Sequence, residues 1–339
     1  MLIIVLALLA TAIMLLQNPE CQTRDCTFAQ FKNHKVRQVS YWQAQMAAPL
    51  RSRVYAAPPD LIEYVELDNE LNDFPAGVKP TENKQTIELV KQALAGIPAP
   101  IMSLFKDRLA GVFIVDNLGS SGYTDQLIQT NGKPYGGFIL LDSAVFDKPA
   151  NAWASWKEST AFSSVADTEI KVTLEDPADD SQVNAIQFIL LHELAHVLAV
   201  GSDIHPDWWL SAIEVRLSDY EFASLSWVLD ESGQSFESRF EAAFPLRPSL
   251  VYYREPGLSA DQMEEVLHSL QKTNFVSPYA ATSPAEDFAE SFAIYVHSEL
   301  MRKPYRIEVL NSGQSLYSME SCFADRCRDK LHLLEALLN

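Results

Sequence analysis

The sequence predicts an α+β fold with a small mixed sheet, and three observations lead to this prediction. Two short runs rich in β-branched and aromatic residues, GVFIVDN at 111–117 and GGFILLD at 136–142, are typical of strands. An almost unbroken apolar stretch at 182–200 predicts a long buried helix. Further helical patterns follow at 259–272 and 284–298. Because the expected order is helix, two strands, a long helix and then more helices, an α+β layout with a helical C-terminal part is favoured.

The chain begins with MLIIVLALLATAIMLL, a run that is apolar apart from one threonine. This length suits a signal-peptide core or a short membrane-spanning helix. We therefore assign 1–20 to a signal peptide or N-terminal membrane anchor, with residues 2–16 as the anchoring segment. No Lys or Arg precedes the run, and no small-x-small cleavage site follows it. Basic residues after the run, such as Arg24 and Lys32, would favour a cytoplasmic body by the positive-inside tendency.

The cysteines indicate the opposite compartment. All four lie near the chain ends, as Cys21 with Cys26 and Cys322 with Cys327, and the residues between these pairs contain none. An even count with matched spacing is typical of two disulfides in an oxidising compartment. A zinc knuckle is the alternative, although such sites usually have tighter C-x₂-C pairs. We expect an exported protein of the periplasm, the cell envelope or the extracellular space, and the spacing leaves the cysteine pairing open.

The remaining segments are assigned by their local patterns. Residues 21–80 are mixed and proline-punctuated, so we expect an irregular N-terminal region ahead of one main domain at 81–339. In that domain a helical pattern runs from Thr81 to Gly96, where Gly-Ile-Pro ends it. A second helical stretch is expected at 101–111, directly before the first strand.

Three later segments carry weaker signals. Residues 117–125, NLGSSGYTD, read as a loop, and 147–180 as loop and connector. Residues 202–258 are aromatic-rich and mixed, and we interpret them as an insertion. The six tryptophans, among them Trp156 and Trp208, are expected to serve packing, with a sugar-binding platform as a weaker alternative.

Charge limits the range of partners. The chain has 26 basic and 45 acidic residues, and its net charge of −19 repels phosphate backbones and anionic lipid surfaces. We therefore expect no nucleic-acid partner. The same surface charge also serves solubility, so it does not by itself identify a cationic substrate.

The long apolar helix contains the motif HELAH. Residues four apart share one helical face, so His192 and His196 can both reach one metal ion. Glu193 is rotated by about 100° and can reach a water at that metal. Burying three ionisable groups in such a helix is costly unless something coordinates them. The pattern therefore predicts a zinc site, and two satisfied core histidines are the structural alternative.

Catalytic zinc normally takes three protein ligands. His205 is one candidate for the third, but a loop histidine packed on Trp208 or Trp209 is the stronger interpretation. The better candidate is Glu286 in YAATSPAEDFAESF, with Glu290 one turn later as an acceptor for a ligating histidine. Ser283 and Glu286 also fit a capping box, in which Glu286 would only bond back to the backbone.

These residues carry a family resemblance. Tyr279, Glu286 and Glu290, downstream of HELAH, resemble the site region of the anthrax lethal factor catalytic domain and of the secreted Pro-Pro endopeptidases. In such gluzincin-type zinc peptidases a tyrosine and a zinc-ligating glutamate follow HExxH. The resemblance implies a zincin-like metallopeptidase domain at 81–339, with Zn²⁺ bound by His192, His196 and Glu286. It covers at most about a fifth of the chain, and the 89 residues between His196 and Glu286 imply the insertion at 202–258.

The resemblance also implies roles for the other residues. Glu193 would act as general base toward a zinc-activated water, Tyr279 would donate a hydrogen bond to the oxyanion, and Glu290 would orient a ligand. A peptide or protein substrate would pair with an exposed sheet edge, and GGFILLD could be that edge or an interior strand. Two other classes stay open: a catalytically silent zinc-fold scaffold of the cell envelope, and a metal-dependent hydrolase of a cell-wall amide.

Overall fold

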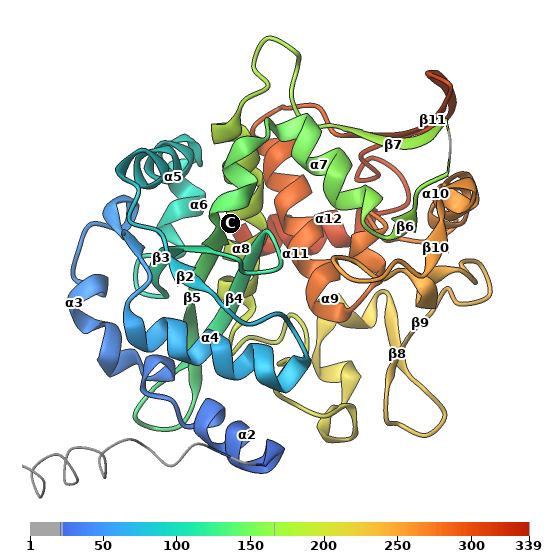
Figure 1. Cartoon of the computed structure of the whole chain (residues 1–339). Helices are drawn as coiled ribbons and strands as arrows, with labels where there is room; N and C mark the ends of the chain where they lie inside the picture. The colour runs from blue at the N-terminus through green and yellow to red at the C-terminus, as the bar shows by residue number, and fades with distance from the viewer. Residues whose placement is uncertain (1–20, 22, 166, 339) are drawn as a thin grey trace, which may run out of the picture.

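The central element of the protein is a five-stranded mixed sheet, seen in a computed structural model that describes residues 21, 23–165 and 167–338. Its strands lie in the order β1-β3-β5-β4, and β2 pairs with β3. β1 and β5 run parallel to β3, whereas β4 runs antiparallel to β5 and forms an edge of the sheet (Figure 1). The bounds are β1 Val54–Ala56, β2 Lys79–Pro80, β3 Leu109–Asp116, β4 Gly122–Ile128 and β5 Pro134–Asp142.

The two predicted strands are therefore present as β3 and β5. Of the two positions left open for GGFILLD, the interior one is observed, because the segment lies in β5 and the sheet edge is β4. The expectation of a loop at 117–125 was wrong in part. Most of β4 comes from the segment expected to be a loop. Its glycine, polar side chains and aspartate are unusual in strands, and pairing along β5 outweighs that weak local preference.

Both faces of the sheet are buried. Alternate residues of β3 enter two separate hydrophobic cores: Val112 and Ile114 join one, Phe113 and Val115 the other. The second core is completed by the N-terminal segment, chiefly by helix α4 (Pro59–Asn72). Residues 21–80 are thus not the irregular region expected from the sequence. They contain α2 (Arg24–Lys32), α4 and strand β1 of the central sheet, because this segment covers an otherwise exposed apolar face.

The first core is built around helix α8 (Gln182–Ala199), as the apolar stretch predicts. Its residues from Ala185 to Ala199 are buried, and it contacts β4 and β5 on one side and α5, α7 and α11 on the others (Figure 1). The Ser181 side chain caps its N-terminus by accepting a hydrogen bond from the Asn184 amide. Gly201 follows it with φ +69°, and a Cβ there would lie 2.6 Å from the carbonyl oxygen of Pro134. Only glycine fits this turn.

Several helices agree with the predictions in part. α5 (Lys84–Gly96) and α11 (Pro284–Ile294) lie where helices are expected, and a π-helical turn at Tyr295–Leu300 extends α11. The helix expected at 101–111 is shorter, because α6 (Ala99–Ser103) ends before β3 begins. The helix expected at 259–272 is present as a 3₁₀ turn, Ala260–Gln262, followed by α10 (Met263–Leu270).

A second sheet and one more helix come from segments with weak sequence signals. The segment 147–180, expected to be a connector, contains α7 (Ala150–Ser159) and β7 (Thr168–Thr173). β7 pairs with β11 (Arg306–Asn311), which also pairs with β12 (Gln314–Glu320), and all three strands are antiparallel. The C-terminal part is therefore not purely helical. The remaining short elements are α3 Gln43–Met46, β6 Phe162–Ser163, α9 Glu221–Ser224, β8 Trp227–Leu229, β9 Phe236–Ser238 and β10 Leu258–Ser259.

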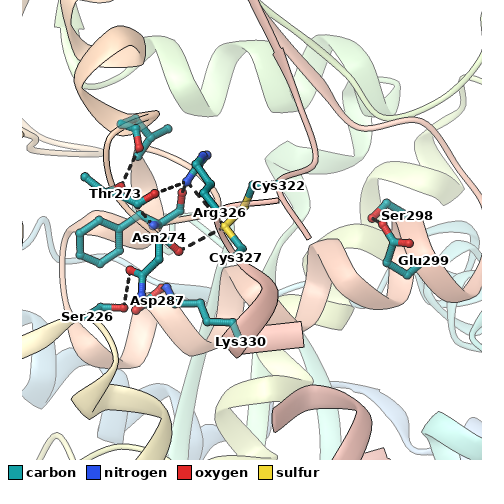
Figure 2. Close-up of a disulfide and its surroundings, with 12 residues drawn as sticks. Ser226, Thr273, Asn274, Asp287, Ser298, Glu299, Cys322, Arg326, Cys327 and Lys330 are labelled. Atoms are coloured by element: carbon teal, nitrogen blue, oxygen red, sulfur yellow. Dashed lines mark hydrogen bonds and ion pairs between the residues drawn. A yellow bond between two sulfur atoms is a disulfide. The ribbon is translucent and has the colours of Figure 1, made fainter. Parts of the chain in front are cut away.

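The cysteines form two local disulfides, Cys21–Cys26 and Cys322–Cys327. The second lies just before helix α12 (Arg328–Leu338), as Figure 2 shows. From α12, the fully buried ammonium of Lys330 donates a hydrogen bond to the buried carboxylate of Asp287 on α11. The two disulfides fit the expected oxidising compartment. Among the described residues no helix is long and apolar enough to cross a membrane. The predicted signal or anchor segment, 1–20, lies outside them.

Candidate metal centre

Three predicted ligands meet in one place. α8 presents His192 and His196 from successive turns, and the first turn of α11 presents Glu286 to them. The two Nε2 atoms of the histidines lie 3.2 Å apart. Oε2 of Glu286 lies 3.0 Å from Nε2 of His192 and 3.7 Å from Nε2 of His196. The three residues form a group that could hold a metal ion.

The spacing of these donor atoms fits a small tetrahedral ion. Zinc bonds to nitrogen and oxygen of about 2.0–2.1 Å place neighbouring ligand atoms roughly 3.3–3.4 Å apart. The three observed separations, 3.2, 3.0 and 3.7 Å, scatter around that value. In addition, Oε2 of Glu286 is buried without a hydrogen bond of good geometry. A buried carboxylate oxygen and two imidazole nitrogens directed at one point are the donor set expected of a metal site.

Glu286 is not merely a capping residue. The Ser283 hydroxyl does accept a hydrogen bond from the Glu286 amide, 3.2 Å away, so half of the expected capping box is present. The Glu286 side chain, however, is directed toward the histidines. Burial would raise the pKa of Glu286, but His196 and His192 outweigh it and hold that pKa well below its usual value. The carboxylate is therefore ionised and available to a cation.

Glu290 holds His192 from behind. Its Oε1 lies 3.0 Å from Nδ1 of His192, so Nδ1–H can donate to it while Nε2 faces the metal position. Lys157 of α7 donates to the same oxygen at 2.9 Å, and the Ser277 hydroxyl donates to Oε2 at 2.7 Å. Burial would raise the pKa of Glu290, but Lys157 and His192 lower it to about 2. Lys157 was not predicted, because its segment was expected to be a connector and a single lysine carries no motif.

Glu193 extends from α8 toward the edge strand β4. It is 5% exposed, and its Oε2 accepts a hydrogen bond of 2.7 Å from the Thr124 hydroxyl. Burial raises the pKa of Glu193 above its usual value. Gly122 makes room for this side chain, because a Cβ there would lie 2.4 Å from Oε1 of Glu193. Thr124 and Gly122 were missed because GSSGYTD was expected to be a loop.

Tyr279 lies beside the ligands, with its ring centroid 5.8 Å from that of His192. The Lys157 ammonium lies 4.3 Å from the centroid of the same ring. Burial raises the pKa of the Tyr279 hydroxyl well above its usual value, so the group stays protonated. Within the described residues its hydroxyl has no hydrogen-bond partner, which leaves it free to donate to a ligand in the cleft.

A cleft of about 750 Å³ opens over this group. One wall is the edge strand β4, and the ring of Trp208 lies 6.0 Å from that of His196. The Trp208 and Trp209 indoles donate to the Asp125 carboxylate at 3.2 and 3.1 Å, which fixes both rings at the cleft. Trp208 packs against His196 and His205 and is still 37% exposed at the cleft. The segment 202–258 contributes this part of the cleft.

His205 is not part of the metal group. Its Nδ1 lies 2.8 Å from the carbonyl oxygen of Pro206, and its ring packs against Trp208 and Phe288. Burial lowers the pKa of His205 to about 4. The interpretation of His205 as a packed loop histidine is therefore confirmed.

Comparisons with known proteins give no relatives. No protein-family model matches the chain, and neither a curated protein nor a solved structure matches it.

Proposed function

We propose that this protein is an exported zinc-dependent endopeptidase of gluzincin type, with a zincin-like arrangement of helix and edge strand. The observation that carries the proposal is the convergence of His192, His196 and Glu286 on one point, with Glu193 next to it and facing β4. Two of these ligands lie on one helix and the third comes from a second helix, as in the lethal-factor-like peptidases that the sequence resembles.

His192, His196 and Glu286 would hold Zn²⁺. The bound ion would supply Lewis-acid chemistry, which makes a water molecule more acidic and polarises a peptide carbonyl. Glu290 and Lys157 would keep the His192 ring oriented and its Nε2 free to bind.

The chain's own groups would then move the protons. Glu193 would take a proton from the attacking water and pass it to the leaving amine, and its raised pKa suits a group that must both accept and donate. Thr124 fixes one oxygen of Glu193, which leaves the other to face the cleft. Tyr279, with a free and protonated hydroxyl, would donate to the oxyanion of the tetrahedral intermediate.

The cleft supports a peptide substrate. β4 is an edge strand, and several of its residues line the cleft beside Glu193. An extended peptide can add to such an edge through backbone hydrogen bonds, which position its carbonyl groups without regard to side chains. The two disulfides support export, because such bonds persist in oxidising compartments.

The decisive experiment is cleavage of a diverse peptide library by wild type, Glu193→Gln and the control Glu88→Gln, with zinc measured in each sample. Glu88 is an exposed residue of α5. We expect zinc in all three and cleavage by wild type and the control only. Zinc without cleavage in all three would instead favour the scaffold, or the hydrolase of a cell-wall amide if wall fragments are cut. Lack of zinc in wild type would refute the metal site.

A further inference from the structure

A second cavity, of about 570 Å³, lies beyond the metal cleft. It opens between α7 and the segment 253–256 of the insertion. Its lining combines aromatic side chains, Trp153, Trp156 and Phe162 among them, with hydroxyl-bearing, small apolar and charged residues. Trp156 packs against Tyr253 and is 39% exposed.

The cavity shares walls with the metal centre. Ser120, Trp153 and Tyr253 line both this cavity and a small recess of about 40 Å³ beside His192 and Glu193. The cavity is therefore a neighbour of the metal-centre recess, and the start of β4 leads a ligand from Glu193 toward it.

Tyr253 is held at this junction in an unusual backbone conformation. Its φ of +60° lies in the left-handed region, which large side chains rarely adopt. Its amide donates to the Thr160 hydroxyl at 3.3 Å, and its own hydroxyl lies 3.5 Å from that of Ser121. Backbone strain of this kind persists where the surroundings impose it and concentrates at functional sites.

The charge at the cavity is opposite to that of the whole protein. Lys148 and Arg254 both line it, and among the described residues neither forms an ion pair with a carboxylate. Their cationic groups lie over aromatic rings instead, Lys148 at 5.3 Å from Trp156 and Arg254 at 4.3 Å from Phe74. Arg254 also donates one hydrogen bond, to the carbonyl oxygen of Asn72 at 3.4 Å. In a chain of net charge −19, two unpaired cations at one cavity are available to a bound anion.

The one carboxylate in the lining does not neutralise them. Asp142 is 6% exposed, and its two oxygens accept hydrogen bonds from backbone amides, from Leu118 at 2.7 Å and from Ala144 at 2.9 Å. Its oxygens are thereby occupied by the backbone, and among the described residues it forms no ion pair with Lys148 or Arg254.

We propose that this cavity binds the part of a peptide that follows the scissile bond, and that it favours an acidic residue beside an apolar one. The direction follows from β4, which leads from Gly122 beside Glu193 toward Ile128. A peptide added antiparallel to β4 runs the other way, so its carboxyl side passes Gly122 and reaches Ser120 and the cavity. Trp156 would cover the apolar side chain, and Lys148 with Arg254 would pair with the acid. This direction of the bound peptide along β4 rests on the proposed peptidase function.

Binding can be measured without turnover. The probes are two acetylated and amidated pentapeptides, three alanines followed by phenylalanine and either glutamate or glutamine. They are titrated calorimetrically into zinc-loaded, full-length Glu193→Gln protein. Two exposed ion pairs should make the glutamate peptide bind roughly three- to tenfold tighter. Adding Lys148→Gln and Arg254→Gln should equalise the two affinities, whereas the charge-matched control pair Lys84→Gln and Lys272→Gln should keep the preference.

The outcomes separate this site from the peptidase proposal. Equal affinities in the parent protein, no binding of either peptide, or a preference that survives Lys148→Gln with Arg254→Gln would each overturn the site. If wild type cleaves no peptide while the charge-dependent preference holds, the peptidase proposal fails and the cavity remains a site for acidic peptides. If wild type does cleave, substrates with glutamate after the scissile bond should have a higher kcat/KM than those with glutamate before it.

Discussion

The ammonium of Lys157 lies 2.9 Å from Oε1 of Glu290, and the same oxygen lies 3.0 Å from Nδ1 of His192. A buried cation on α7 is thereby connected through one carboxylate to a candidate metal ligand on α8. Lys157 also contacts Glu158 at 3.2 Å, and the Tyr252 hydroxyl donates to that second carboxylate at 2.8 Å. Lys157 thus compensates one of the two buried carboxylates, so that Lys157, Glu158 and Glu290 together carry a net charge of about −1. The network also fixes the orientation of the His192 ring.

Removal of the charge of Lys157 or of Glu290 should therefore weaken metal binding. We expect Lys157→Met and Glu290→Gln to lower zinc affinity about 10- to 100-fold, as loss of such supporting groups does at other metal sites. Competition with a chelator measures this, with circular dichroism as the check on folding. Lys171→Met, an exposed change on β7, is the control. Wild-type zinc affinity in folded Glu290→Gln would show that Glu290 does not support the ligand.

Gly122→Ala should separate zinc binding from activity. The new methyl group would collide with Glu193, whose carboxylate would have to leave Thr124, while the three ligands stay in place. A displacement of about 1 Å can cost roughly a hundredfold in rate, so we expect at least that loss in kcat/KM with normal zinc content. Peptide cleavage measures kcat/KM, and metal analysis of the same sample measures the zinc content. Full activity would mean that Glu193 is not held in its working position.

The buried pair of Asp287 and Lys330 predicts a stability effect. Lys330→Met leaves the Asp287 charge uncompensated beside the Trp227 indole, which donates to it at 3.2 Å. We expect the free energy of unfolding to fall by about 3–5 kcal/mol, measured by urea denaturation. Asp287→Asn combined with Lys330→Met should recover much of the loss because no charge is then left unpaired. A double variant no more stable than Lys330→Met would contradict the pairing.

Asp68, at the cleft, predicts a pH dependence. Burial, and next the nearby Asp125, raise the pKa of Asp68 to about 6. A carboxyl whose pKa is higher in the folded state than in the unfolded state contributes stability that is complete below about 4 and is lost as the pH rises through 6. Asp68→Asn removes this loss, so its melting temperature should exceed that of wild type at pH 8 and approach it at pH 4.

The comparison is calorimetric, with Asp107→Asn, an exposed change between α6 and β3, as the control. A difference between wild type and Asp68→Asn that is the same at both pH values would contradict the raised pKa.

The sequence by itself determined the elements whose signals are local. The apolar stretch with histidines four residues apart predicted α8 and the common face of His192 and His196, because a helix places residues one turn apart side by side. The β-branched runs predicted β3 and β5. Glu286 and Glu290 were identified for the same reason, since Ser283-Pro284 marks the start of a helix and fixes which residues share its face.

Only the tertiary structure decided which distant segments complete the site. Thr124 reaches Glu193 across 69 residues, and Lys157 reaches Glu290 across 133. Neither segment shows a period of its own: β4 is a polar edge strand, and α7 was hidden in an apparent connector. Which segment pairs at a sheet edge or covers an apolar face depends on the apolar surface that the rest of the chain leaves exposed. This is a property of the whole chain and not of the segment. The candidate histidine ligands could therefore be predicted from local spacing, and Glu286 from its helix start together with the need for a third ligand. The groups that orient them are assigned only once packing brings the segments together.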